Sequence, residues 1–187
     1  MKLHTLLLAS ILAAGATACL ADPAIACIKA DALQSQLTPA ELYPAVASCI
    51  RDSDVPSAVL LAALGNAYAA YDAQRVSDQT ATSAGNVLQR AAMSTLSDDQ
   101  KRQLAMGVIT TMRDPAQQAA LCQNLRRIGP PSYVPTYMIN HGMAAVGTAL
   151  TKTAGGDSVP NSGLKPQFDG TDTWQQVLQG YMHCPAV

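Results

Sequence analysis

The chain has 187 residues, 49% of them hydrophobic and 13% charged, with a single Trp and a single Phe. Its length suits one domain with a sizeable core, and so few aromatic residues favour helices over a sheet. The formal net charge of −1 argues against nucleic acid or an anionic membrane surface as the main partner.

Residues 1–21 have the layout of a secretory signal peptide. Lys2 supplies a positive start, an apolar stretch runs to Ala16, and small residues precede a cut that we predict after Ala21, with Ala18 as the other position that fits. The apolar stretch is too short to span a bilayer. We therefore expect a processed protein of residues 22–187, in the periplasm or secreted, with no membrane span.

Cys19 offers a second interpretation of the same segment, because a lipoprotein signal also ends at a cysteine. Such signals carry Leu three residues earlier, whereas this chain has Ala16 at that position. The cleaved signal peptide is therefore favoured over lipidation. Loss of Lys2 with the signal changes the formal net charge to −2.

Helical spacing of apolar residues and helix-start signals recur along the processed chain. Thr38 with Glu41, Asp54, Ser97 with Gln100, and Asp114 each fit a helix N-terminus. The helices expected from these signals span residues 23–36, 38–51, 54–71, 77–91, 97–112, 114–128, 135–150 and 173–182. The sequence predicts an all-α fold, a single compact bundle of about seven to eight helices, in one domain with a long loop at 153–172.

Four cysteines remain after signal cleavage: Cys27, Cys49, Cys122 and Cys184. An even count in an exported chain predicts disulfides. Cys27 and Cys49 lie eleven residues before and after Thr38, where the first two expected helices would form a hairpin. Equal arms bring these two cysteines together, so we predict a Cys27–Cys49 bond and, by exclusion, a Cys122–Cys184 bond.

Two segments are candidates for a contact surface. Tyr133, Tyr137 and His141 recur at intervals of four and can share one helical face, either half-buried with each polar tip finding a partner or as an interface patch. Lys165, Phe168 and Asp169 stand out in the 153–172 loop. Phe168 can anchor a partner or fold back to cover the core.

Signals for chemistry are weak by comparison. The sequence contains no HExxH, GxSxG, glycine-rich phosphate loop or CxxCH. Met138, His141 and Met143 could hold copper, but methionine at helical spacing is more often core filler. Asp72, Arg75 and Asp78 could form a charged cluster, although we favour a solvated helix junction with weak ion pairs. We expect no cofactor and no metal.

An exported helical domain with four cysteines and no catalytic motif resembles the periplasmic immunity proteins that neutralise type VI secretion effectors, including those guarding against cell-wall amidases and lipases. The resemblance rests on residues 1–21, the four cysteines and helices along the whole processed chain. It implies a tight protein–protein interface in which a loop or helix end plugs the toxin's active-site cleft. No family motif is matched residue by residue, so no functional position is carried over.

The sequence therefore favours a non-catalytic periplasmic binding protein, an immunity protein whose partner is a toxin or effector. Tyr133, Tyr137, His141 and residues 155–170 are the expected contact surface. Two other functions stay open. One is a hydrolase centred on His141, and the other is a carrier of a small ligand or of copper.

Overall fold

The computed structural model describes residues 25–153 and 163–186, so the predicted signal peptide and Cys19 lie outside the described residues. The described helices are α1 Pro39–Arg51, α2 Val55–Arg75, α3 Ala84–Met93, α4 Asp98–Arg113, α5 Pro115–Ile128, α6 Thr136–Ile139, α7 Met143–Thr153 and α8 Gly170–Gln176. Short turns η1 Ala30–Ala32, η2 Gln79–Ala81 and η3 Val177–Tyr181 join or extend them. The predicted all-α bundle is confirmed. Within these residues, no helix has the length and apolarity needed to cross a membrane.

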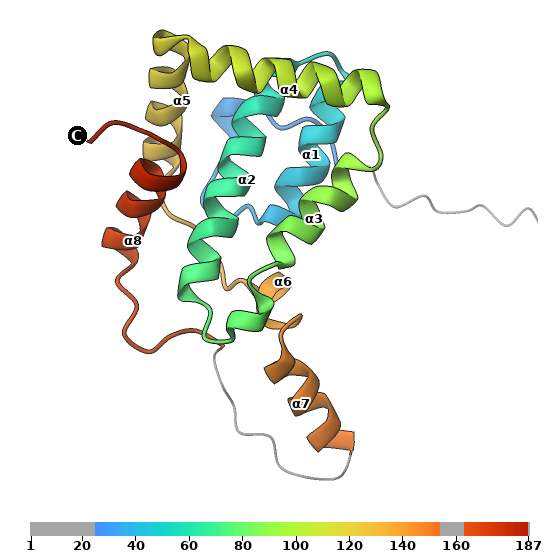
Figure 1. The fold of residues 1–187 in the computed structure, drawn as a ribbon, viewed down its shortest axis with the longest axis vertical. Coiled ribbons are helices and arrows are strands. Elements are labelled where there is room, and N and C mark those ends of the chain that lie inside the picture. Colours follow the sequence, from blue (N-terminus) through green and yellow to red (C-terminus); the bar gives the residue numbers. More distant parts are fainter. Residues whose placement is uncertain (1–24, 154–162, 187) are drawn as a thin grey trace, which may run out of the picture.

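Helix α2 lies at the centre of the bundle (Figure 1). It packs against α1, α3, α4 and α8, and its buried residues lie on most of its circumference: Ala58, Val59, Leu60, Leu61, Ala63, Leu64, Gly65, Ala67, Tyr68, Tyr71, Asp72 and Arg75. A helix that is apolar on nearly all sides is stable only when other elements enclose it. Its sequence therefore makes α2 the core helix around which the others are arranged.

The predicted helix starts are confirmed where a side chain satisfies the free backbone N–H groups. Asp54 accepts a hydrogen bond from the Ser57 N–H at the start of α2. The Ser97 hydroxyl and the Gln100 side chain form the reciprocal capping box of α4. A hydrogen bond from the Lys29 ammonium is the main cause that lowers the pKa of Asp54 to about 2, which keeps this cap ionised.

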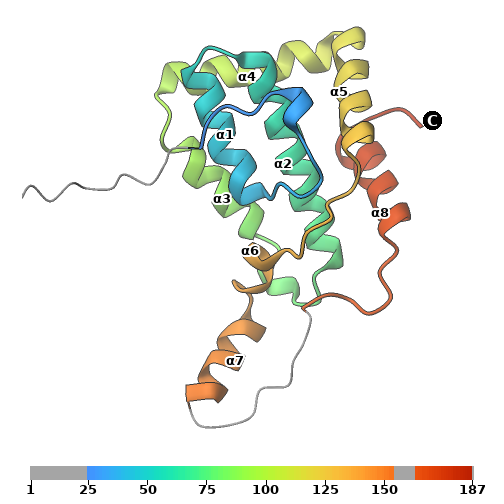
Figure 2. The ribbon, with the colours of Figure 1, turned by 180° about the vertical axis from the view of Figure 1, so that it is seen from behind.

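The helix predicted over residues 23–36 is wrong for the described residues 25–36, which form an extended segment with one 3-10 turn. This segment crosses the face made by α1 and α2 (Figure 2). The Ile25 carbonyl accepts a hydrogen bond from Ser48 Oγ at 2.5 Å, and Lys29 forms an ion pair with Asp54. Contacts to α1 and α2 thus outweigh the helix propensity of the segment.

Both predicted disulfides are present, Cys27–Cys49 with a Cα–Cα distance of 4.5 Å and Cys122–Cys184 with 5.6 Å. The helical hairpin from which the first was predicted does not exist, since Cys27 lies in the extended segment. The pairing is nevertheless right, because Leu37 and Thr38 still reverse the chain between the two cysteines. The second bond attaches the C-terminal tail to α5.

Two further helix boundaries differ from prediction. Asp78, not Ser77, provides the cap before η2, and the following helix starts only at Ala84. The last helix starts at Gly170 because Asp169 accepts a hydrogen bond from the Asp172 N–H. The predicted 153–172 loop is therefore shorter at its C-terminal end, and its residues 154–162 lie outside the described residues.

Candidate functional site: the α6–α7 arm

A buried ion pair lies where the chain leaves the bundle towards α6 and α7. Asp72 is fully buried and Arg75 nearly so, with Arg75 Nε 2.8 Å from Asp72 Oδ1. The hydroxyl groups of Tyr133 and Tyr137 donate to Asp72 Oδ2 at 2.8 and 2.7 Å. The prediction of a solvated junction at Asp72 and Arg75 is wrong, because these two tyrosines and Tyr71 pack around the pair.

The electrostatics of this cluster favour the protonated form of Tyr133 and Tyr137. Burial raises the pKa of Asp72, while Arg75 and the two hydroxyl donors lower it. Burial and the Asp72 charge raise the pKa values of Tyr133 and Tyr137 well above the ordinary value. Arg75 Nη2 also donates to the Tyr133 carbonyl at 2.8 Å. The cluster thus ties residues 133–137 to the C-terminal end of α2, which is a structural role.

The other predicted contact residues separate into packed and exposed ones. The Phe168 ring stands edge-on to Tyr71 with centroids 5.2 Å apart, so Phe168 folds back on the core, and Asp169 caps α8. Lys165 and His141 are exposed. The expected face shared by Tyr133, Tyr137 and His141 does not form, because Tyr133 precedes α6 and both tyrosines point to Asp72.

The residues considered for copper do not face a common site. Met138 is fully buried in a small core with Val76, Ala81 and Ala84, whereas Met143 is 65% exposed. Within residues 25–153 and 163–186, no group of three or more His, Cys, Asp or Glu side chains is arranged to hold a metal ion. His141 is exposed at the base of α7, and a hydrolase centred on it stays a prediction.

The helix predicted over 135–150 is interrupted at residues 140–142, which separates α6 from α7. Side chains from a distant turn then cap α7. The Met143 N–H donates to Thr80 Oγ1 at 2.9 Å, and the Ala144 N–H donates to Asp78 Oδ2 at 2.8 Å. Hydrogen bonds to its carboxylate lower the pKa of Asp78, with the Thr80 hydroxyl as the largest contributor. A long-range cap therefore starts a separate helix here.

Gly142 makes this cap possible. A Cβ atom at this position would lie 2.2 Å from Asp78 Oδ2 and 3.1 Å from the Ala81 Cβ. A larger residue would push the Asp78 carboxylate away from the Ala144 amide. Gly142 thus allows the η2 turn to approach the start of α7 closely.

Helix α7 extends away from the bundle in both views (Figures 1 and 2). Its large apolar residues point outward: Met143 is 65% exposed, Val146 48% and Leu150 66%. These residues are three and four positions apart and share one face. We call them, with Gly147 between them, the outer face of α7. Surface helices usually direct such a face to the core, so the outer face of α7 has the arrangement expected of a contact surface.

The inner face of α7 carries small or polar residues that line a cavity of about 350 Å³ towards the bundle: Ala144, Ala145, Thr148, Ala149 and Lys152. A Cβ atom added at Gly147 would have no atom of the described chain within 4 Å. No other described segment therefore packs closely against α7 at this position. Sequence reasoning missed the outer face, although the 143–146–150 spacing was a readable signal.

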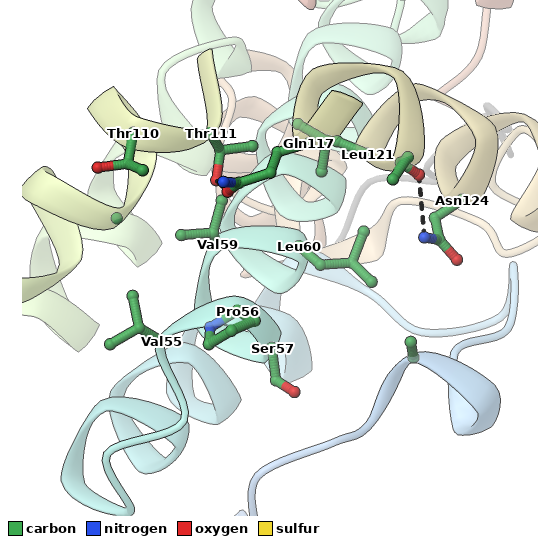
Figure 3. A pocket seen from close by; sticks show the side chains of 13 residues that line it. Val55, Pro56, Ser57, Val59, Leu60, Thr110, Thr111, Gln117, Leu121 and Asn124 are labelled. Atoms are coloured by element: carbon green, nitrogen blue, oxygen red, sulfur yellow. Dashed lines mark hydrogen bonds between the residues drawn. The ribbon is translucent and has the colours of Figure 1, made fainter. Parts of the chain in front are cut away.

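A second hollow lies at the other end of the bundle, between α2, α4 and α5 (Figure 3). Its volume is about 460 Å³, and we call it the α4 groove. Val55, Val59, Leu60 and Leu121 form apolar walls, while threonine, serine, glutamine and asparagine side chains lie at its rim. Its lining contains no charged residue.

Comparison with known proteins adds no family assignment: no family model, curated protein or solved structure matches this chain. Functional statements therefore rest on residues 136–153, which we call the α6–α7 arm, and on the chemistry of the exposed face of α7.

Proposed function

We propose that this protein is an exported, non-catalytic binding protein of the immunity class, which neutralises a secreted antibacterial toxin with α7 as its contact element. The observation that carries the proposal is the outward orientation of Met143, Val146 and Leu150. Leaving three large apolar side chains in water has no benefit for folding, whereas aromatic and apolar anchors at a helix face are the usual means of binding a groove.

The attachment of α7 supports this role. Asp78 and Thr80 fix its first turn, and the Asp72 cluster fixes the segment before α6. Contacts that fix the start of α7 reduce the entropy that the helix loses on binding, which favours affinity. Gly147, in the middle of the outer face, would allow the backbone of a partner to approach closely.

The disulfides suggest an oxidising extracellular or periplasmic environment. Together with the signal peptide expected over residues 1–21, they support a partner that is encountered outside the cytosol. A toxin delivered into the periplasm would meet this protein there.

Co-expression with the product of the neighbouring gene tests the proposal. We expect that product to be toxic in the periplasm, and we expect this protein to relieve the toxicity and to co-purify with it. Leu150→Glu should weaken binding roughly thirtyfold, as for an interface hot spot of about 2 kcal/mol.

Thr148→Glu is the matched control, because it places the same charge on the opposite face of the same helix. It should retain binding. If the neighbouring product is harmless, or if both variants protect as well as the wild type, an immunity function through α7 is wrong.

A further inference from the structure

The chain leaves the bundle before α7 and returns to the same place after it. Ile139 before α7 and Leu164 after it both pack against the small core that contains Val76. A Cβ atom added at Gly163 would lie 2.6 Å from Ile139 Cγ2, so the outgoing and returning segments are in direct contact. Residues 143–162 are therefore an insertion whose flanking segments meet at its base, and we call them the α7 insertion.

The returning segment is attached to the bundle by main-chain hydrogen bonds. The Ser77 N–H donates to the Gly163 carbonyl at 2.9 Å, and the Lys165 N–H donates to the Arg75 carbonyl at 2.8 Å. Neither bond involves a residue of the α7 insertion. Both can therefore stay in place when the insertion is shortened.

The described part of the α7 insertion contributes nothing to the core. None of residues 143–152 is buried, and only Ala145 is partly buried. Burial of apolar surface is the main stabilising term in folding, whereas the large apolar residues of α7 stay exposed. Substitutions along the outer face of α7 should therefore change the stability of the bundle very little.

The bundle supplies the first turn of α7. Helix α7 has 11 residues, with Gly147 among them, and isolated helices shorter than about 12–15 residues are marginal in water. Thr80 and Asp78 accept hydrogen bonds from its first two N–H groups at 2.9 and 2.8 Å. These bonds offset the unfavourable start of a helix. The bundle thus acts as a scaffold on which the contact helix can form.

We propose that α7 is an exchangeable specificity element, which determines the toxin that is bound, and that the bundle does not need the α7 insertion in order to fold. The inference deepens the proposed function and rests on it for the bound molecule being a toxin. Met143, Val146 and Leu150 match the spacing of anchors in helix-in-groove recognition. The partner surface is therefore a cleft of the toxin with an apolar strip about 10 Å long, the rise of seven helical residues.

A deletion variant tests both halves of the proposal. A flexible linker of about six Gly and Ser residues, which spans up to about 20 Å, joins Gly142 to Gly163 in place of the α7 insertion. A second version has a linker of about ten residues and spans up to about 34 Å. The deletion removes no buried residue of the described chain and shortens a loop. We expect a urea-unfolding midpoint equal to or above that of the full chain, together with loss of protection against the toxin.

A full-length variant makes the same test without a deletion. Met143→Gln, Val146→Gln and Leu150→Gln are combined, and the unfolding midpoint should stay within about 0.3 M urea of the wild type. Affinity for the toxin should fall at least about a hundredfold, as for the loss of several interface anchors. Leu64→Ala, at a fully buried position of α2, is the matched control. It should lower the midpoint by about 1 M or more.

A lower midpoint with both linkers, or with the triple variant, overturns the proposal, because the α7 insertion would then support the bundle. Full protection by a folded deletion variant also overturns it, since recognition would then lie elsewhere. The unfolding measurements need no toxin and are independent of the proposed function. If the deletion variant is as stable as the full chain but the full chain protects against no neighbouring product, the immunity function is wrong and the independence of the bundle is still supported.

Discussion

Asp72 shows how strongly one buried charge can organise its surroundings. It lies on the central helix, yet its partners Tyr133 and Tyr137 are more than 60 positions away in sequence. Arg75 stands 5.3 Å from the ring centroids of both Tyr71 and Tyr133, so cation–π contacts accompany the ion pair. A desolvated carboxylate is tolerated here because Arg75 and the hydroxyl groups of Tyr133 and Tyr137 all donate hydrogen bonds to it.

Removal of the carboxylate should be costly for this reason. Asp72→Ala leaves the buried Arg75 without its counter-charge, and we expect the free energy of unfolding to fall by about 3–5 kcal/mol. Tyr137→Phe removes one hydrogen bond to a charged group, for which about 1.5–3 kcal/mol is expected. Urea unfolding measures both losses.

Tyr181→Phe is the control for the tyrosine change, because Tyr181 is 56% exposed. Its effect should stay within about 0.5 kcal/mol. A Tyr137→Phe loss as small as this would mean that its hydroxyl contributes nothing to the cluster.

At the scale of elements, α7 differs from the other long helices in what holds it. Helices α1 to α4 pack against one another, whereas α7 depends on the cap from Asp78 and Thr80 and on the tight fit at Gly142. Its position is set by a few polar contacts at one end and not by a buried face. Such an element should open more readily than the bundle.

Two glycine substitutions on this arm should have opposite effects. Gly142→Ala forces the Asp78 carboxylate away from the Ala144 amide, so hydrogen exchange of residues 143–153 should become faster while the bundle is unchanged. Gly147→Ala meets no atom within 4 Å and should stabilise the helix by roughly 0.5–1 kcal/mol, which slows exchange. Exchange measured by mass spectrometry distinguishes them, and equal rates in the two variants would contradict the proposed role of Gly142.

At the scale of the whole molecule, the disulfides join segments that the helices alone leave loosely attached. Cys27–Cys49 spans 22 residues and holds the extended N-terminal segment, while Cys122–Cys184 spans 62 and holds the tail after η3. Both bonds lie beside the main core, to which Cys49, Cys122 and Cys184 belong.

The longer loop should make the second disulfide the more stabilising one. On the chain-entropy model, replacing Cys122 and Cys184 by Ser should cost about 4 kcal/mol, and replacing Cys27 and Cys49 about 3 kcal/mol. Urea unfolding of the two double variants gives the comparison. A larger loss from the Cys27–Cys49 variant would show that contacts of the N-terminal segment, and not loop length, dominate.

The helical class, most helix starts and both disulfide pairings could be predicted from local sequence patterns. Caps such as Asp54 and Ser97 bond to residues three positions away, so the local amino-acid sequence is enough to recognise them. The cysteine pairing followed from chain reversal near Thr38, which holds whether or not the flanking segments are helical.

The extended form of residues 25–36, the burial of Asp72 and the outward orientation of α7 could not be predicted in this way, because long-range packing sets them. Each depends on residues far away in sequence: Ser48 for Ile25, Tyr133 for Asp72, and Asp78 for the start of α7. The apolar spacing of α7 predicts a helix with one apolar face, but it does not indicate which way that face points. The direction depends on which other parts of the chain lie next to the helix. At α7, the bundle lies next to the small residues of the inner face, so the large apolar residues point away from it.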